Sequence, residues 1–175
     1  MASSTSSPDP AQAAFNKAIR EFKAGLKNEA LYSEILSTTS ADQVYDLTDK
    51  LQNEQIRGGH LRNLAKLKPY LERLQGYFGA IDTFVQAKAD ILALIWGPIR
   101  LLIQWASTLT SSLDALINTT AEIGLLLPEF GLAVKLFGHN SMVKEVLALF
   151  FQDILDFYLV ALKFFSMPRK LRDIG

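Results

Sequence analysis

Apolar residues recur at helical spacing from about residue 11 onward. The first stripe has steps of four, three and four residues: Phe15, Ile19, Phe22 and Leu26. Charged residues fill the positions between them, which is the pattern of an amphipathic helix of about four turns. Further stripes predict a short helix over 28–36 and a longer one over 41–57. Ser40 and Gln43 have the spacing of a capping box in front of the longer helix.

Prolines and glycines divide the rest of the chain. Pro69 lies inside a leucine stripe, and because proline removes a backbone donor and clashes with the preceding turn, a new helix is expected over 69–86. A long apolar segment starts at Ile91, and Gly97-Pro98 predicts a kink in it. Three helical segments are expected after it: a hairpin partner ending at Leu127, a short helix ending near Gly138 and a last helix over 141–165.

Strand-like alternation is absent, so the sequence predicts an all-α fold, a single-domain bundle of about seven or eight helices. The 175 residues are the size of one domain. The last helix carries apolar residues on more than one face, which predicts that it packs centrally. Four large side chains are expected in the core: Trp96, Leu101, Phe150 and Ile154.

The expected organisation has three parts. Residues 1–10 are rich in serine and proline and have little to bury, which predicts a disordered leader. Residues 11–166 form the bundle. Residues 167–175 are expected to be a basic tail or the start of a linker to a C-terminal region beyond this chain.

Charge and cysteine content narrow the function classes. The 18 Lys and Arg residues balance the 18 Asp and Glu residues, so there is no overall basic field to attract nucleic acid. The absence of cysteine excludes disulfides, thiolate metal sites and cysteine nucleophiles, and fits a reducing compartment. The first ten residues lack the features of a secretory signal. A cytoplasmic protein is therefore expected.

No motif in the sequence predicts catalysis. His60 and His139 have no partner at metal-ligand spacing, and Ser141 lacks a nucleophile-elbow sequence and better suits a helix N-cap. Phosphate-binding glycine loops are also missing. The pairs Glu122 and Glu129, and Asp153 and Asp156, are interpreted as solvated faces or ion-pair partners. The sequence thus predicts a non-enzyme without catalytic, cofactor-binding or metal-binding residues.

Two kinds of surface are candidates for binding. Arg62 and Lys66, and later Arg172, lie in locally basic segments that could meet anionic lipid, although a solvated helix face is the favoured interpretation of these segments. The apolar face of the first helix completes the candidate membrane or partner surface: Phe15, Ile19 and Phe22. We expect clustering to release this helix from the bundle and expose that face.

The apolar stretch from Ile91 to Trp105 has the composition of a membrane span. Arg100 lies near the middle of a 19-residue window that starts at Ile91. A central arginine costs roughly 2.5–3.5 kcal/mol on insertion scales, and Gly97-Pro98 interrupts the helix. A buried core helix is therefore the favoured interpretation.

Several apolar motifs resemble the N-terminal helical domain of fungal NLR-like proteins, the STAND architectures in which such a domain precedes a NACHT-type NTPase and ankyrin-like repeats. They are Ile95-Trp96-Gly97-Pro98, Glu122-Ile123-Gly124, Leu127-Pro128 and Asp153-Ile154-Leu155-Asp156-Phe157. Trp96, Gly97, Pro98 and Pro128 are the core residues of this resemblance. It covers roughly residues 15–165 and rests on core motifs, not on catalytic signatures.

The resemblance implies a function. Such a domain is the output module of its receptor, so it implies a signalling or effector domain that acts through oligomerisation in regulated cell death or heterokaryon incompatibility, with membrane targeting as one route. The expected partners are a second copy, another signalling domain or anionic lipid, with membrane association on activation. The alternative is a structural or adaptor module that packs on a neighbouring NTPase and restrains it.

Overall fold

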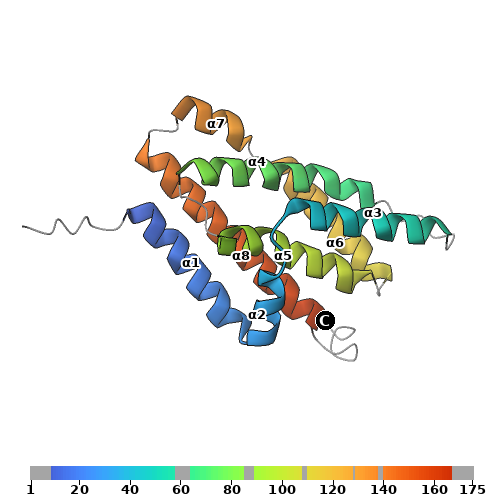
Figure 1. Ribbon diagram of the computed structural model, residues 1–175. Helices are drawn as coiled ribbons and strands as arrows, with labels where there is room; N and C mark the ends of the chain where they lie inside the picture. Colours follow the sequence, from blue (N-terminus) through green and yellow to red (C-terminus); the bar gives the residue numbers. More distant parts are fainter. Residues whose placement is uncertain are drawn as a thin grey trace, which may run out of the picture.

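Helices account for the regular structure of the described residues (Figure 1). The computed structural model describes residues 9–57, 64–84, 89–107, 110–127, 129–137 and 140–166. The elements in these ranges are α1 (Pro10–Leu26), α2 (Glu29–Leu36), α3 (Ala41–Arg57), the 3-10 helix η1 (Leu64–Leu67), α4 (Lys68–Phe84), α5 (Ala89–Ala106), α6 (Thr110–Leu126), α7 (Phe130–Phe137) and α8 (Ser141–Ser166). They include no strand, and the predicted all-α bundle is confirmed.

The start of α1 lies within the predicted leader. The Asp9 Oδ1 atom accepts a hydrogen bond from the Ala11 N–H at 3.0 Å, and Pro10 occupies the first turn, where its missing N–H costs nothing. The predicted leader boundary at residue 10 is therefore slightly too late, since Asp9 is the N-cap and Pro10 is the first residue of the helix. Residues 1–8 lie outside the described residues.

Polar side chains cap two later helices. The Gln43 Oε1 atom accepts the backbone N–H of Ser40 at 3.3 Å and that of Thr39 at 2.8 Å, so the glutamine half of the predicted capping box is present at the start of α3. The N-cap expected at Ser141 is wrong by one residue. Asn140 fills that role, because its Oδ1 accepts the Met142 N–H at 2.9 Å.

Two prolines mark different features of the fold: Pro69 lies at the start of a helix, as predicted, and Pro98 lies inside one, directly after a glycine. Helix α4 starts at Lys68, directly before Pro69 and after η1. Helix α5 continues through Pro98, so the predicted interruption of the helix at Gly97-Pro98 is wrong. A Cβ atom on Gly97 would collide with the backbone carbonyl oxygen of Ile35 in α2. The glycine therefore allows α2 and α5 to approach closely, which no larger residue would permit.

Helix α5 is the centre of the bundle. Twelve of its 18 residues are buried, since α2, α3, α6 and α8 all pack against it. Among the described residues it is the one helix long and apolar enough to cross a membrane, but 67% of that segment is buried in the fold, as in an ordinary core helix. Trp96, Leu101 and Ile154 are buried as predicted, whereas Phe150 is partly buried and packs on the core.

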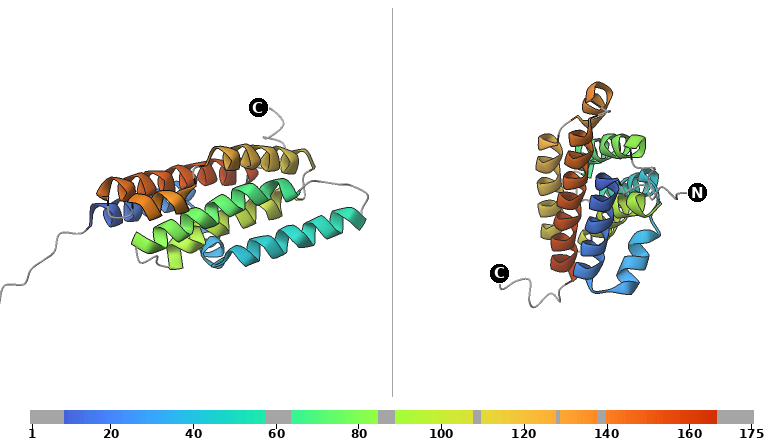
Figure 2. Two further views of the ribbon diagram at one scale, coloured as in Figure 1. Left: turned by 90° about the horizontal axis from the view of Figure 1, so that it is seen from above. Right: turned by 90° about the vertical axis from the view of Figure 1, so that its left-hand side faces the viewer.

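Helices α1 and α8 lie side by side (Figure 2, right). Helix α8 packs tightly along α1 and against α5, while α6 is held mainly by α4 and η1. In the α1–α8 contact, the Phe15 and Phe151 rings are 5.2 Å apart, and a Cβ on Gly25 would lie 2.5 Å from the Leu159 Cδ2 atom. Helices α6 and α8, by contrast, are not closely packed on each other.

Candidate functional site

The apolar face of α1 is buried inside the bundle. Phe15 and Phe22 are buried, and Ile19 is partly buried and packed on the same cluster. In this conformation α8 covers the face, as the release hypothesis requires of the resting domain, and its exposure on clustering stays a prediction. It would become available only if α1 left the bundle, and burying a phenylalanine stabilises its position by roughly 1.5–3 kcal/mol.

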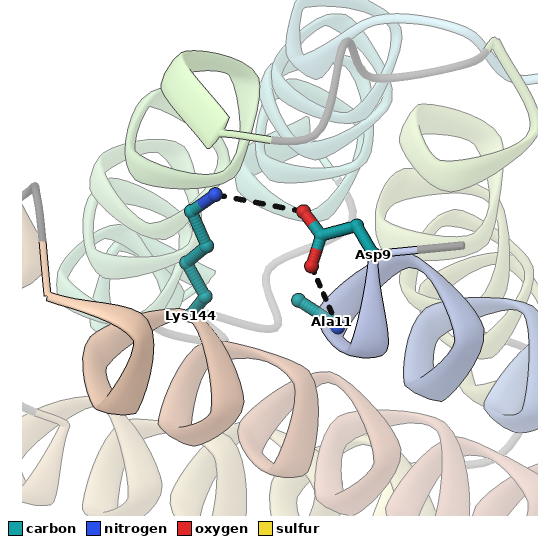
Figure 3. Close-up of polar contacts among 3 residues, drawn as sticks. All are labelled: Asp9, Ala11 and Lys144. Atoms are coloured by element: carbon teal, nitrogen blue, oxygen red, sulfur yellow. Dashed lines mark hydrogen bonds and ion pairs between the residues drawn. The ribbon is translucent and has the colours of Figure 1, made fainter. Parts of the chain in front are cut away.

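A polar contact holds the start of α1 to α8 (Figure 3). The Asp9 carboxylate that caps α1 also pairs with Lys144 of α8, with 3.5 Å between Oδ2 and Nζ. Both side chains remain partly exposed to water, so this pair contributes at most about 1 kcal/mol. The apolar contacts, rather than this ion pair, therefore keep α1 in place.

The predicted basic surface is described only in part. Lys66 is exposed on η1, and its Nζ atom lies 3.5 Å from the Asn118 Oδ1 atom of α6. The other residues singled out by charge, imidazole chemistry or family motif lie outside the described residues: Arg62, Arg172, His60, His139 and Pro128. Of the predicted motif core, the structure buries Trp96, Gly97 and Pro98 together in α5.

The outer face of α8 is exposed over its whole length. It carries five large apolar side chains that remain open to solvent: Met142, Val146, Leu149, Val160 and Phe164. Two carboxylates, Asp153 and Asp156, interrupt this face near its middle. The prediction that α8 packs centrally is therefore wrong for this side of the helix, because α1 and α5 cover only its other faces.

An apolar groove separates α6 from α8. It encloses about 190 Å³ and is lined by six apolar or aromatic residues and one carboxylate: Tyr70, Ile123, Leu127, Phe150, Ile154, Phe157 and Asp153. Clefts that hold small-molecule ligands usually measure about 300–1,000 Å³. This groove is smaller, and its size suits one or two apolar side chains of a partner.

Buried tyrosines support the groove from beneath. The Tyr70 hydroxyl donates to the Tyr158 hydroxyl at 3.1 Å, and Tyr158 donates to the Ile95 carbonyl oxygen at 3.1 Å. Burial raises the pKa of both hydroxyls. The Tyr77 hydroxyl donates to the Leu147 carbonyl oxygen at 2.5 Å, and burial, followed by the Asp153 carboxylate, raises its pKa. These neutral hydrogen bonds fix α4, α5 and α8 relative to one another.

Helix α6 also depends on α4 at the groove. A Cβ on Gly124 would lie 2.7 Å from the Tyr70 backbone nitrogen, so the two helices meet at their backbones. The glycine of the Glu122-Ile123-Gly124 motif thus brings α6 close to α4, and Ile123 and Tyr70 both line the groove. The motifs interpreted as core are therefore partly a groove lining.

A short ridge projects beside the groove. The inner side of α7 is anchored by Phe130, whose ring is 4.9 Å from Tyr77 and 4.8 Å from Phe150. Just before the helix, Glu129 Oε1 pairs with Arg73 at 2.9 Å. The outer side carries two leucines one turn apart, Leu132 (57% exposed) and Leu136 (64% exposed). We call Leu132, Lys135 and Leu136 the α7 ridge.

Groove and ridge both belong to one sequence family. The family model described as Domain of unknown function (DUF7708) matches residues 65–174, which is more than half of the chain. The chain belongs to this family. The DUF7708 region contains every residue of the groove and the α7 ridge, whereas α1, α2 and α3 precede it. No curated protein and no solved structure matches the chain.

Sequence reasoning missed the groove and the ridge. The sequence did carry a signal for the groove in α8, where apolar residues occupy more than one face, but that pattern was interpreted as burial. Leu132 and Leu136 gave a weaker signal, because a helix of eight residues carries only two turns of periodicity. Among the described residues, no group of three or more His, Asp or Glu side chains is placed to hold a metal ion.

Proposed function

We propose that this domain is a non-catalytic signalling or effector module of an NLR-like receptor, and that it acts by associating with further copies of itself. The observation that carries the proposal is the open apolar groove between α6 and α8, next to the α7 ridge and the apolar outer face of α8. Monomeric proteins rarely leave large contiguous apolar surface open to water unless another molecule covers it.

The resemblance to fungal NLR-like proteins supports the receptor context. Its motif residues Ile123, Leu127, Asp153, Ile154 and Phe157 line the groove. An output domain that is activated by clustering needs a surface that is idle at low local concentration and occupied at high local concentration. Regulated cell death or heterokaryon incompatibility is the outcome that this context implies.

The experiment is to express residues 1–175 in yeast, either alone or fused to an inducible dimeriser or tetrameriser. We expect growth to continue with the unfused domain and to stop when oligomerisation is induced. The dimeriser without the domain is the control. Unchanged growth under induced oligomerisation, with the protein shown to be present and folded, would contradict an effector role.

The alternative proposal is a module that packs on a neighbouring NTPase and restrains it. The same groove could receive an element of that NTPase, since its lining is apolar with a single carboxylate. This function predicts normal growth in the assay above. It also predicts that deleting residues 1–166 from a longer receptor raises its nucleotide hydrolysis, which an effector domain need not do.

Membrane targeting is the more specific form of the effector proposal. It requires α1 to leave α8 and present Phe15, Ile19 and Phe22 to anionic lipid. Phe22→Asp would be a poor test, because Phe22 is buried and the variant would unfold the domain. Asp9→Ala is better, since it loosens only the start of α1. We expect it to increase dye leakage from anionic liposomes under forced oligomerisation, whereas equal leakage would count against this route.

A further inference from the structure

The α7 ridge offers apolar side chains of the kind that the groove can accept. Leu132 and Leu136 lie on one side of α7 and are exposed by more than half, while the groove is an apolar recess of about 190 Å³. Phe130 and the Glu129–Arg73 pair fix α7 on its own α4. The ridge of a copy is therefore held in the open beside its own groove, and it is available to a different molecule.

The charges of the two surfaces are complementary. Lys135 is exposed on the ridge, and Asp153 is exposed at the groove, with Asp156 one turn further along α8. Within the described part of the chain, none of these three residues has an ion-pair partner. If Lys135 entered the groove beside the two leucines, its positive charge would pair with the Asp153 carboxylate.

We infer that the α7 ridge of one copy inserts into the α6–α8 groove of a second copy, with Lys135 of the ridge opposite Asp153 of the groove. The inference rests on the proposed self-association and names its interface. A symmetric pairing of two α8 outer faces is the competing geometry. It would bring Asp153 and Asp156 of both copies together, and like charges opposite each other disfavour such a contact.

This contact joins two different surfaces, so it is head to tail. Each added copy leaves one ridge and one groove unoccupied, and the assembly grows into a chain or closes into a ring. A symmetric contact would instead stop at a dimer. Head-to-tail growth is the behaviour that a clustering module needs.

Two exposed positions allow each surface to be disabled separately. Leu136→Asp places a carboxylate on the ridge opposite Asp153 and leaves the groove intact. Asp153→Lys places an amine in the groove opposite Lys135 and leaves the ridge intact. Both side chains are exposed, so neither change disturbs the core. Asp49→Lys, on the exposed side of α3, makes the same charge change elsewhere and is the matched control.

The experiment is sedimentation velocity over a concentration series. We expect the wild type and Asp49→Lys to grow beyond a dimer, and each interface variant alone to associate at least about tenfold more weakly. An equimolar mixture of Leu136→Asp and Asp153→Lys should form a dimer and nothing larger, because one intact ridge and one intact groove remain. The double variant Lys135→Asp/Asp153→Lys should associate with itself but not with the wild type.

Three results would overturn the inference. They are association of both single variants at wild-type strength, a mixture that stays monomeric while the wild type associates, and a wild type that is monomeric at all concentrations up to the millimolar range. The growth assay with forced oligomers does not use this interface. It therefore tests the proposed function independently. If forced oligomers stop growth while both single variants associate as strongly as the wild type, the effector role stands and the natural contact lies elsewhere.

Discussion

Helices α5 and α8 are both long and rich in apolar residues, yet α5 is buried on most sides and α8 has an exposed apolar face. Helix α5 is covered by neighbours on several sides, and its central residues from Ala93 to Ile99 are all buried. Helix α8 has α1 and α5 on two sides, and its outer face keeps five large apolar side chains in solvent. The difference lies in the neighbours that each helix finds, not in its apolar content.

The comparison separates two uses of apolar surface. In α5, apolar side chains stabilise the domain itself, and close contacts such as Gly97 against Ile35 leave no free space. In α8, they line a groove and an open face, where they contribute little to folding but can be buried by a partner. Changes in α5 should therefore alter stability, and changes on the outer face of α8 should alter association.

Among the substitutions, truncating the core of α5 should have the largest effect on stability. Trp96 is 2% exposed, and Trp96→Ala leaves a cavity that the surrounding helices cannot fill. We expect the free energy of unfolding to fall by roughly 3–5 kcal/mol, as for other buried aromatic residues, as measured by urea denaturation followed by circular dichroism. A loss below about 1 kcal/mol would mean that α5 is not the centre of the core.

The next effect comes from adding one methyl group to α5. Gly97→Ala would drive a Cβ into the Ile35 carbonyl oxygen, so we expect a loss of roughly 1–3 kcal/mol from overpacking. Gly76→Ala in α4 is the matched control, because nothing lies within 4 Å of its added Cβ. That variant should gain roughly 0.5–1 kcal/mol from helix propensity. Equal effects of the two variants on the urea midpoint would contradict the close approach of α2 and α5.

Alkaline pH should weaken the tyrosine contacts between α4, α5 and α8. Burial raises the pKa of Tyr70, Tyr77 and Tyr158 above the ordinary value of 10.0, so the folded state keeps protons that the unfolded state loses. Stability should be constant below pH 10 and fall above it, by about 1.4 kcal/mol per pH unit for each such tyrosine. Urea denaturation at pH 8 to 11.5 checks this. The free energy of unfolding of Tyr158→Phe should fall less steeply with pH than that of the wild type. An equal slope would show that Tyr158 does not contribute to the loss.

The smallest effect on stability is expected on the outer face of α8. Leu149 is exposed, and Leu149→Ser should change the free energy of unfolding by no more than about 0.5 kcal/mol in a dilute, monomeric sample. The same urea protocol as for Trp96→Ala gives the comparison directly. A loss of several kcal/mol would show that this side of α8 is buried after all.

Much of the fold could be predicted from the sequence because its signals are local. Helical periodicity placed each helix, Gln43 and Pro69 marked helix starts, and the charge of Arg100 argued for a core helix in place of a membrane span. The start of α1 was placed one residue late because Pro10 was counted with the Ser- and Pro-rich leader. The N-cap of α8 was placed one residue late because Asn140 and Ser141 have similar capping ability.

The candidate site could not be predicted in the same way, because it depends on which helices pack together. Phe15 and Phe22 formed the clearest amphipathic stripe, and the stripe is buried for the same reason that it is clear: it faces α8. The groove joins Tyr70 with Ile123 and Phe157, which are far apart along the chain. Periodicity identifies an apolar face but does not say whether another element covers it.

Hydrogen–deuterium exchange of the whole chain at low and at high protein concentration tests the contrast between α5 and α8 most directly. We predict that the amides of α5 exchange slowly at both concentrations, as expected for the core. Exchange in α7 and around residues 149–157 of α8 should slow at high concentration only, as the ridge and the groove become covered. Two results would contradict this contrast. One is exchange in α7 and α8 that stays the same at both concentrations while the mass of the assembly rises, and the other is fast exchange in α5.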